Sequence, residues 1–307
     1  MRIAILGAGA MGSSFSFPPA DNGNEVCLVG THLDDSLISE ARGTGVHPRA
    51  GIPFPGNVEV YPLSEFANVM KTTPDLVVLG VSSAGIAWAV RQLTATLRKP
   101  VPVLLLTKGL AAEGARLRAL TDTVAEALSD FFGRKCIVAG VAGPCIATEL
   151  AARRPTSVVI AGSSDDTLVA IQSAIETGYY RVSVTRDATG IEACAAYKNF
   201  YALAVGAAAG WNETRPIPVN RAGMNNATAS MFARALQEME YLVGKMGGKA
   251  ETVYGLAGSG DLYVTCQAGR NSRMGRLLGT GLSYSEAKAA HMPEDTIEGA
   301  ELAGVIG

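Results

Sequence analysis

The sequence predicts an α/β fold in two parts: an N-terminal Rossmann-like, doubly wound domain at residues 1–187 and a mainly α-helical C-terminal domain at 188–307. Three observations predict it. A glycine-rich turn follows the first apolar run, and short apolar runs then alternate with helix-like segments. After about Asp187, alanine, glycine, methionine and glutamate dominate and strand-like runs disappear. A length of 307 residues, about twice that of a typical domain, agrees with two domains.

Six short runs in the first half are rich in Val, Ile and Leu, and most end in Gly, Ser or Thr: Arg2–Leu6, Glu25–Val29, Leu76–Val81, Val101–Leu106, Lys135–Ala139 and Ser157–Ala161. This composition is typical of parallel strands that are covered on both faces. The intervening segments Ala84–Leu97 and Ala115–Phe132 have helical periodicity. We therefore predict a mostly parallel sheet with helices on both sides.

The second half contains two long helical patterns, Thr189–Trp211 and Asn225–Met246, and Asn225 is a candidate cap for the second. Between them, Asn212–Gly223 carries two prolines and predicts a loop.

Composition narrows the class of protein. Apolar residues make up 48% of the chain and charged residues 18%, which indicates a globular fold. The net charge of −2 gives no support to nucleic-acid or membrane-surface binding. No apolar run of about 18 residues is uninterrupted, so we predict no membrane span. The five cysteines are scattered and form no CxxC motif, which favours a reducing, cytoplasmic location and no metal site.

Gly7, Gly9 and Gly12 form a G-x-G-x-x-G motif directly after the first predicted strand. In a dinucleotide-binding fold the first glycine permits the tight turn, the second lets backbone approach a pyrophosphate, and the third lets the helix pack on the strand. Pro18 and Pro19 fall where that helix should continue, so we expect the helix to be short, bent or interrupted.

The second predicted strand is followed by Gly30, Thr31 and His32. An acid at this point would bind the ribose of NAD, whereas an arginine would suit NADP. Neither is present, and Asp34 and Asp35 lie slightly too far along the chain. Thr31 and His32 are candidates for contact with a 2′-phosphate, although an exposed loop position explains His32 equally well.

Two residues at the ends of later strands are candidates for ligand contact. Lys108 is a candidate for a phosphate or nicotinamide-side contact; the alternative is a solvated lysine. Cys145 has no histidine near it in sequence to activate it, so we interpret it as a small residue lining the site. The chain has three histidines and none lies in a cluster, so we do not expect histidine to be the proton donor.

Lys198 is the strongest candidate for the proton donor. It lies inside an otherwise apolar helical segment, and burial lowers the pKa of a lysine toward neutrality. A carboxylate such as Asp261 would hold and orient it; the alternative is a lysine that extends to solvent from a helix edge. Asp261 itself stands in a run of small residues that is followed by Arg270 and Asn271, whose donors suit a phosphate.

These features together resemble the NAD(P)-dependent sn-glycerol-3-phosphate dehydrogenase family. The shared motifs run in the family's order over essentially the whole chain: GAGAMG at 7–12, TKGL at 107–110, AGPCIATELA at 142–151, AYKN at 196–199, NNATA at 225–229, GLAGSGDL at 255–262, GRN at 269–271 and IEG at 297–299. GDL followed by GRN, with a KN lysine upstream, is specific to this family within its superfamily.

The resemblance implies hydride transfer between NAD(P)H and C2 of dihydroxyacetone phosphate, giving sn-glycerol 3-phosphate for glycerophospholipid synthesis. It implies that Lys198 is the general acid/base and also a substrate ligand. The other implied substrate ligands are Lys108, Gly143, Cys145, Asp261, Gly269, Arg270 and Asn271. The implied ligands of the cofactor, NAD or NADP, are Gly7, Gly9, Ala10, Met11, Gly12, Thr31, His32, Lys108, Ala147, Arg270, Thr296 and Glu298. A homodimer is the family expectation.

The chain departs from the family pattern at several points. Cys145 replaces the usual serine and is a weaker hydrogen-bond donor. Tyr197 replaces leucine, and Thr228 replaces a lysine or arginine, so no role is carried over to Thr228. The segment between Trp211 and Asn225 is longer than usual. The family continues with further C-terminal helices after IEG, so we expect Gly307 to end a truncated or short variant.

Two other functions remain open from the sequence. A dehydrogenase of the same superfamily acting on a 3-hydroxy acid or a 2-ketoacid would share the glycine-rich start and a helical lysine, but not GDL followed by GRN. An inactive nucleotide-binding homologue is favoured slightly by the paired prolines, by Cys145 and by the short C-terminus. The intact Lys198, Asp261 and Arg270 argue against it.

Overall fold

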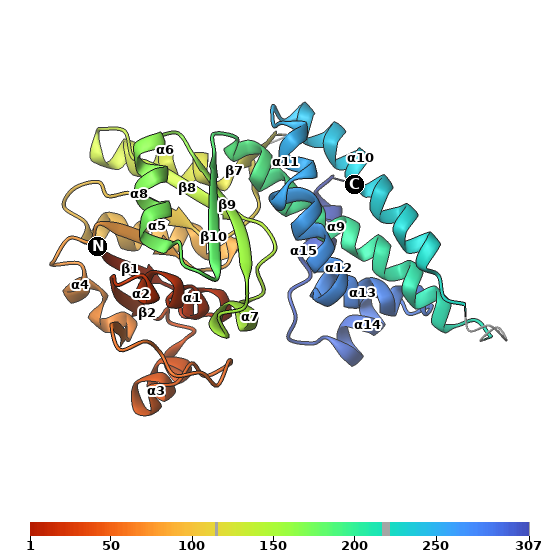
Figure 1. Cartoon of the computed structure of the whole chain (residues 1–307), viewed down its shortest axis with the longest axis horizontal. Helices are drawn as coiled ribbons and strands as arrows, with labels where there is room; N and C mark the ends of the chain where they lie inside the picture. The colour runs from red at the N-terminus through yellow and green to blue at the C-terminus, as the bar shows by residue number, and fades with distance from the viewer. Residues whose placement is uncertain (114–115, 217–221, 307) are drawn as a thin grey trace. The chain divides into compact units, whose positions relative to one another are not determined.

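The computed structural model of this protein describes residues 1–113, 116–216 and 222–306. It divides into two compact units, Met1–Ala188 and Thr189–Gly307 (Figure 1). The first unit is an eight-stranded sheet between helices, and the second is helical. The predicted fold class is therefore confirmed.

The sheet of the first unit has the strand order β10-β9-β8-β5-β4-β1-β2-β3. Its strands are β1 (Arg2–Leu6), β2 (Glu25–Val29), β3 (Val58–Tyr61), β4 (Leu76–Leu79), β5 (Val103–Leu105), β8 (Val138–Ala142), β9 (Thr156–Gly162) and β10 (Tyr180–Thr185). All neighbours pair in parallel except β8 and β9, which are antiparallel. The sequence contains no signal for that reversal, and it was not predicted.

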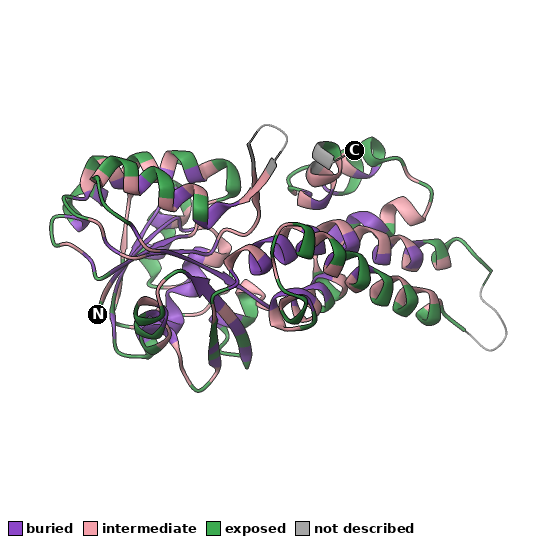
Figure 2. Ribbon diagram, turned by 90° about the horizontal axis from the view of Figure 1, so that it is seen from above, coloured by how far each residue is buried: buried purple, intermediate pink, exposed green. Residues whose placement is uncertain are grey.

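Alternate residues of β1 enter two different cores, because successive side chains of a strand point to opposite faces. Ile3 and Ile5 pack on one face, and Ala4 and Leu6 on the other. The first face is covered by α1 (Ala10–Phe15), α2 (Phe17–Asp21), α3 (Asp35–Thr44), α7 (Ala147–Ala151) and α8 (Asp165–Ile175). The second face is covered by α4 (Phe66–Val69), α5 (Ile86–Thr96) and α6 (Leu120–Phe132). The inner strands are consequently buried on both faces (Figure 2).

The helix after the glycine-rich turn is interrupted, as the paired prolines predict. It stops at Phe15, and α2 restarts at Phe17 with proline in its first turn. Proline is tolerated there because the first amides of a helix have no partner within the helix. The break places the proline pair in the first turn of α2, where a missing amide hydrogen costs no hydrogen bond within the helix.

The predicted helix at Ala115–Phe132 is wrong in its first part. Leu110–Glu113 and Arg116–Ala119 form an antiparallel ribbon, β6 and β7, and α6 begins only at Leu120. Residues 114 and 115 lie outside the described part. The sequence Arg-Leu-Arg-Ala at 116–119 alternates with the period of a strand, which the longer helical pattern obscured.

Two strands of the eight-stranded sheet were missed because they are edge strands. β3 lies at one end of the sheet and β10 at the other. In β10, buried Tyr180 and Val182 alternate with exposed Arg181 and Ser183. Such strands lack the continuous apolar run that identifies buried parallel strands.

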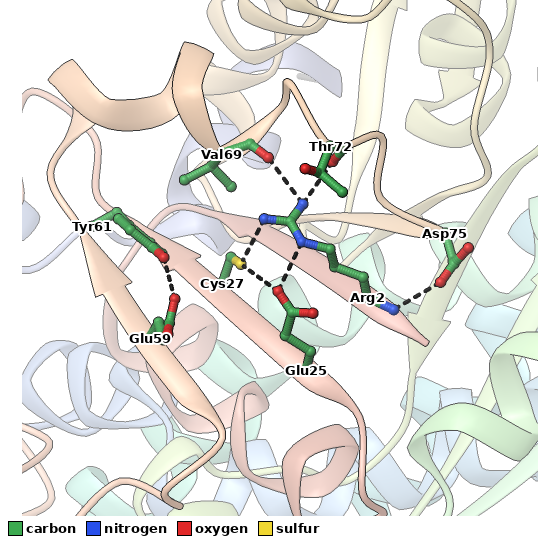
Figure 3. A network of polar contacts seen from close by, with 8 residues as sticks. All are labelled: Arg2, Glu25, Cys27, Glu59, Tyr61, Val69, Thr72 and Asp75. Atoms are coloured by element: carbon green, nitrogen blue, oxygen red, sulfur yellow. Dashed lines mark hydrogen bonds and ion pairs between the residues drawn. The ribbon is translucent and has the colours of Figure 1, made fainter.

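Polar contacts tie together the edge of the sheet at which β1, β2 and β4 begin (Figure 3). The Arg2 guanidinium donates to Glu25 Oε1 at 2.8 Å and to the Thr72 carbonyl at 2.7 Å, and the Arg2 amide donates to Asp75 Oδ2 at 2.8 Å. Cys27 belongs to this network through its contacts with Arg2 and Glu25. Burial raises the pKa of Cys27 to about 11, so its thiol stays protonated and unreactive. We interpret this edge as structural.

The second unit consists of helices. They are α9 (Ala188–Glu213), α10 (Asn225–Lys245), α11 (Ala250–Tyr254), the π-helical turn η3 (Leu256–Gly260), α12 (Asp261–Ala268), α13 (Arg270–Gly279), α14 (Tyr284–His291) and α15 (Glu298–Ile306). The predicted cap at Asn225 is wrong, because Met224 precedes the helix and no side chain caps it. The predicted loop Asn212–Gly223 includes residues 217–221, which lie outside the described part. Across the described residues, no helix is long and apolar enough to span a bilayer.

Helices α9 and α13 touch through glycines on both sides. A Cβ added to Gly210 on α9 would lie 1.9 Å from the Arg276 carbonyl oxygen, and one added to Gly275 on α13 would lie 2.0 Å from that of Leu203. Only glycine fits at such a backbone contact. This contact sets the position of α13 relative to α9.

Candidate active site

The glycine-rich turn has the shape that a dinucleotide pyrophosphate needs. Gly7 has φ +112, and a Cβ on it would lie 2.7 Å from the backbone of Gly80. A Cβ on Gly12 would lie 1.9 Å from the Gly7 carbonyl oxygen, so both glycines are required by internal packing. A Cβ on Gly9 would meet nothing within 4 Å. Gly7 and Gly12 are thus packed against backbone, whereas Gly9 is open on the side where its Cβ would lie. This openness suits the close approach of a phosphate group.

The turn after β2 is organised by a carboxylate that the sequence reasoning set aside. Thr31 is buried, and its hydroxyl donates to Asp34 Oδ2 at 2.8 Å. The same oxygen accepts the amide of Ala8, in the glycine-rich turn, at 3.1 Å. His32 is exposed, and its ring lies edge-on to Trp88 with centroids 5.5 Å apart. The spacing Thr-x-x-Asp at a strand end was the signal that could have revealed this contact.

The ends of β5 and β8 are joined by a predicted site residue. Lys108 Nζ donates to the Gly143 carbonyl oxygen at 3.2 Å, where Gly143 has φ +124. Cys145 follows and is partly buried, and Ala147 opens α7. The structure therefore brings Lys108 and Gly143 together at the edge of the sheet where the parallel strands end.

A buried ion pair lies in the second unit. Lys198 Nζ on α9 is 2.5 Å from Oδ1 of Asp261, the first residue of α12, and the side chains are 10% and 3% exposed. This confirms the predicted neighbourhood of the two residues. Thr265 Oγ1 donates to the Asp261 carbonyl oxygen at 2.6 Å. A lysine enclosed in this way needs its carboxylate partner, because an unpaired buried charge is costly.

Asn271 and Glu298 join the start of α13 to the start of α15. The Arg270 guanidinium lies 2.6 Å from Glu298 Oε1, and Asn271 Nδ2 donates to Glu298 Oε2 at 3.3 Å. The Gly299 amide donates to Asn271 Oδ1 at 2.9 Å. Asn271 is 3% exposed, whereas the Arg270 side chain is 53% exposed. Asn271 thus has a bridging role that sequence reasoning missed, and Arg270 presents its charge at the surface.

The expected site residues divide between the two units. The first unit holds Gly7, Gly9, Ala10, Met11, Gly12, Thr31, His32, Lys108, Gly143, Cys145 and Ala147. The second holds Lys198, Asp261, Gly269, Arg270, Asn271, Thr296 and Glu298.

Family models described as the N-terminus and the C-terminus of NAD-dependent glycerol-3-phosphate dehydrogenase match residues 2–168 and 187–306. The chain belongs to the NAD-dependent glycerol-3-phosphate dehydrogenase family. The family predicted from the sequence motifs is therefore confirmed. The two family matches together cover nearly all of the chain.

Members of the glycerol-3-phosphate dehydrogenase family are also the relatives found by sequence. The chain is 35% identical over 287 residues to the NADP(+)-dependent glycerol-3-phosphate dehydrogenase of Archaeoglobus fulgidus, covering 94% of this chain and 82% of that protein. It is 32% identical over 287 residues to glycerol-3-phosphate dehydrogenase [NAD(P)+] of Shouchella clausii, covering 93% of this chain and 80% of that protein.

Solved structures agree with the family assignment. The glycerol-3-phosphate dehydrogenase of Coxiella burnetii superposes with a TM-score of 0.83 at 30% identity, covering 99% of this chain and 87% of that one. A structure of D-mandelate dehydrogenase gives a TM-score of 0.54 at 15% identity, covering 97% of this chain and 86% of that one. That likeness shows the fold alone, so the alternative of a different hydroxy acid or ketoacid gains no support from it.

Proposed function

We propose that this protein is an NAD(P)-dependent glycerol-3-phosphate dehydrogenase, an oxidoreductase that acts on a CH–OH group. It transfers hydride reversibly between NAD(P)H and dihydroxyacetone phosphate, giving sn-glycerol 3-phosphate, a precursor of glycerophospholipids. The observation that carries the proposal is the buried pair of Lys198 with Asp261, because it supplies a proton donor to a chain whose histidines lie elsewhere. The family membership supports it.

Lys198 is the general acid of this reaction. When bound, the reduced nicotinamide supplies the hydride. The Lys198 ammonium polarises the substrate carbonyl and donates its proton to the oxygen as negative charge develops there. Asp261 holds the ammonium in place and compensates its charge. In the oxidation direction Lys198 takes the proton back.

The substrate phosphate is held at the start of α13. Arg270 provides a partly exposed guanidinium there, Gly269 precedes the first turn, and Asn271 fixes the backbone around them. Arg270 suits a phosphate because its donors are arranged in a planar fork. Binding energy from this remote group positions the reacting carbon. The family resemblance supports Lys108, Gly143 and Cys145 as further substrate contacts.

The dinucleotide is held at the glycine-rich turn by Gly7, Gly9, Ala10, Met11 and Gly12. Other cofactor contacts that the family resemblance supports are Thr31, His32, Lys108, Ala147, Arg270, Thr296 and Glu298. Of the two residues after β2, we expect the side chain of His32 to meet a 2′-phosphate, because the Thr31 hydroxyl already donates to Asp34. Either NAD or NADP is accommodated.

The proposal also includes a homodimer in the cytoplasm. The dimer is the family expectation. The five cysteines are scattered along the chain and form no CxxC motif, which favours a reducing compartment.

Initial rates with dihydroxyacetone phosphate and each of NADH and NADPH test the proposal. We expect substrate-dependent loss of the absorbance of the reduced nicotinamide, because only hydride transfer consumes it. A panel of 2-ketoacids and 3-hydroxy acids is the control. Turnover of a panel compound but not of dihydroxyacetone phosphate would establish the related dehydrogenase instead. Nucleotide binding without any oxidation would establish the inactive homologue.

A further inference from the structure

One oxygen atom of Asp34 accepts three hydrogen bonds inside the first unit. Asp34 Oδ2 accepts the Thr31 amide at 2.8 Å, the Thr31 hydroxyl at 2.8 Å and the Ala8 amide at 3.1 Å. Asp34 and Thr31 are each 8% exposed, and Ala8 is 4% exposed. The Thr31 hydroxyl also accepts the Leu33 amide at 3.2 Å, which closes the loop on itself. A carboxylate this enclosed is stabilised by such donors.

The contact of Asp34 with Ala8 joins the loop after β2 to the glycine-rich turn. Ala8 stands between Gly7, whose backbone is packed against Gly80, and Gly9, which faces open space. Its amide points to a carboxylate of the neighbouring loop and is therefore not a donor to a ligand. Asp34 consequently fixes the Gly7–Ala8 peptide, next to Gly9, and links it to the end of β2.

We propose that Asp34 is a positioning residue for the dinucleotide: it holds the glycine-rich turn and Thr31 in one arrangement and acts through them rather than as a ribose ligand. This inference rests on the proposed function, because it assumes that the turn binds a nicotinamide nucleotide. The three donors already occupy Oδ2, so this atom has no capacity left for a ribose hydroxyl.

The two nucleotides distinguish positioning from ribose binding. A ribose ligand contacts the 2′-hydroxyl, which NADH has and NADPH carries as a phosphate ester. Loss of a ribose ligand would therefore weaken the binding of NADH alone. Loss of a residue that positions the turn weakens the binding of both nucleotides, because both present the same pyrophosphate.

The experiment measures the Kd of NADH and of NADPH by fluorescence titration of the full-length protein without substrate. We expect Asp34→Ala to raise both Kd values by a similar factor, about 10-fold, as for one lost hydrogen bond to a charged group. Asp34→Asn keeps an acceptor oxygen at this position, so we expect it to rescue binding to within about 3-fold of the wild type. Asp35→Ala is the matched control, because Asp35 is an exposed neighbour at the start of α3.

Steady-state kinetics separate this role from a general loss of structure. We expect kcat at saturating nucleotide and the KM for dihydroxyacetone phosphate to stay near the wild-type values in Asp34→Ala. The proposal would be overturned if only the Kd of NADH rose in Asp34→Ala, or if the Kd values of both nucleotides stayed unchanged. Circular dichroism verifies folding of each variant.

Thr31→Val provides the test should Asp34→Ala fail to fold. It removes one donor to Oδ2 at nearly constant shape, and we expect both Kd values to rise by roughly the same few-fold factor. Unchanged values for both would count against the proposal. If the wild type binds neither nucleotide, the proposed function itself fails; if it binds both but does not reduce dihydroxyacetone phosphate, only the proposed reaction fails.

Discussion

At the scale of single residues, Lys198 combines burial with a carboxylate partner. Its ammonium is 2.5 Å from Asp261 inside a helical unit whose neighbouring segments are rich in alanine and glycine. Its position between Ala196 and Phe200 in an apolar helix made the lysine recognisable from the sequence. Its pairing with Asp261 was predicted too, because the motif around Asp261 is distinctive. The Thr-x-x-Asp spacing indicates the contact of Asp34 with Thr31, but its contact with the Ala8 amide escaped prediction because it joins two loops that are 26 residues apart in sequence.

Replacing Lys198 with alanine removes the proposed proton donor. We expect kcat to fall by about 10²–10⁴-fold, while the Kd of the nucleotide changes little. Lys245→Ala is the control, because Lys245 lies at the exposed end of α10, over the Tyr241 ring. Stopped-flow or steady-state reduction of dihydroxyacetone phosphate measures the effect, and near-wild-type turnover of Lys198→Ala would refute the role.

Replacing Arg270 with alanine tests the phosphate contact. We expect kcat/KM for dihydroxyacetone phosphate to fall by roughly 10–100-fold, the worth of a charge-assisted hydrogen-bond pair. The slower reduction of dihydroxyacetone, which lacks the phosphate, should be equal in variant and wild type. Arg273→Ala, one turn along the same helix and paired with Asp295, is the control. An equal loss with both substrates would assign Arg270 a role other than phosphate binding.

At the scale of elements, the contact between α9 and α13 has no freedom to relax. A Cβ at Gly210 would stand 1.9 Å from a backbone oxygen, and backbone cannot rotate away as a side chain can. The helix that carries Lys198 and the helix that begins with Arg270 are therefore held in register by glycines.

Gly210→Ala should separate these two helices. We expect a loss of about 1–3 kcal/mol in the free energy of unfolding, as for other overpacked contacts, and a lower kcat/KM. Gly244→Ala is the matched control on α10, where an added Cβ meets nothing within 4 Å. For Gly244→Ala we expect the free energy of unfolding to rise by about 0.4–1 kcal/mol, because alanine has fewer conformations than glycine in the unfolded chain. Urea denaturation measures both, and equal stability of the two variants would contradict the packing argument.

The elements predicted best from sequence are two strands next to the glycine-rich turn and the two longest helices, whereas the strand predicted at Lys135–Ala139 lies at Val138–Ala142. β1 and β2 were predicted with their observed bounds, and α9 and α10 to within two residues at each end. The edge strands, the ribbon before α6 and the reversal of β9 were not predicted, because half-exposed strands and strand direction depend on neighbours that are distant in sequence.

At the scale of the whole molecule, stability depends on a buried histidine. His47 is 2% exposed; its Nδ1 accepts the amides of Arg49 and Ala50 at 3.2 Å, and its Nε2 lies 3.1 Å from Ser14 Oγ on α1. Burial lowers the pKa of His47 from its ordinary value of 6.5, whereas a hydrogen bond to the backbone of the glycine-rich turn opposes that shift. An Nδ1 that accepts two amides cannot carry a proton without losing both.

This environment predicts a loss of stability in acid. The folded pKa is depressed, so the unfolded chain binds more protons below 6.5. The contribution of His47 to the free energy of unfolding is fully present above pH 6.5. It is lost as the pH falls from 6.5 toward the pKa of His47 in the folded protein. Urea unfolding on either side of this value measures it, with His47→Gln as the comparison. We expect a smaller change in the variant; an identical pH dependence would exclude His47.

The reversal of β9 determines where a label can be attached to this enzyme at a distance from the cofactor. Six strands end at the edge of the sheet that carries the glycine-rich turn, whereas β9 and β10 end at the opposite edge. The exposed turn at Ser163, directly after β9, therefore faces away from the nucleotide. A fluorophore or an electrode linker attached there would report on the enzyme without obstructing its cofactor.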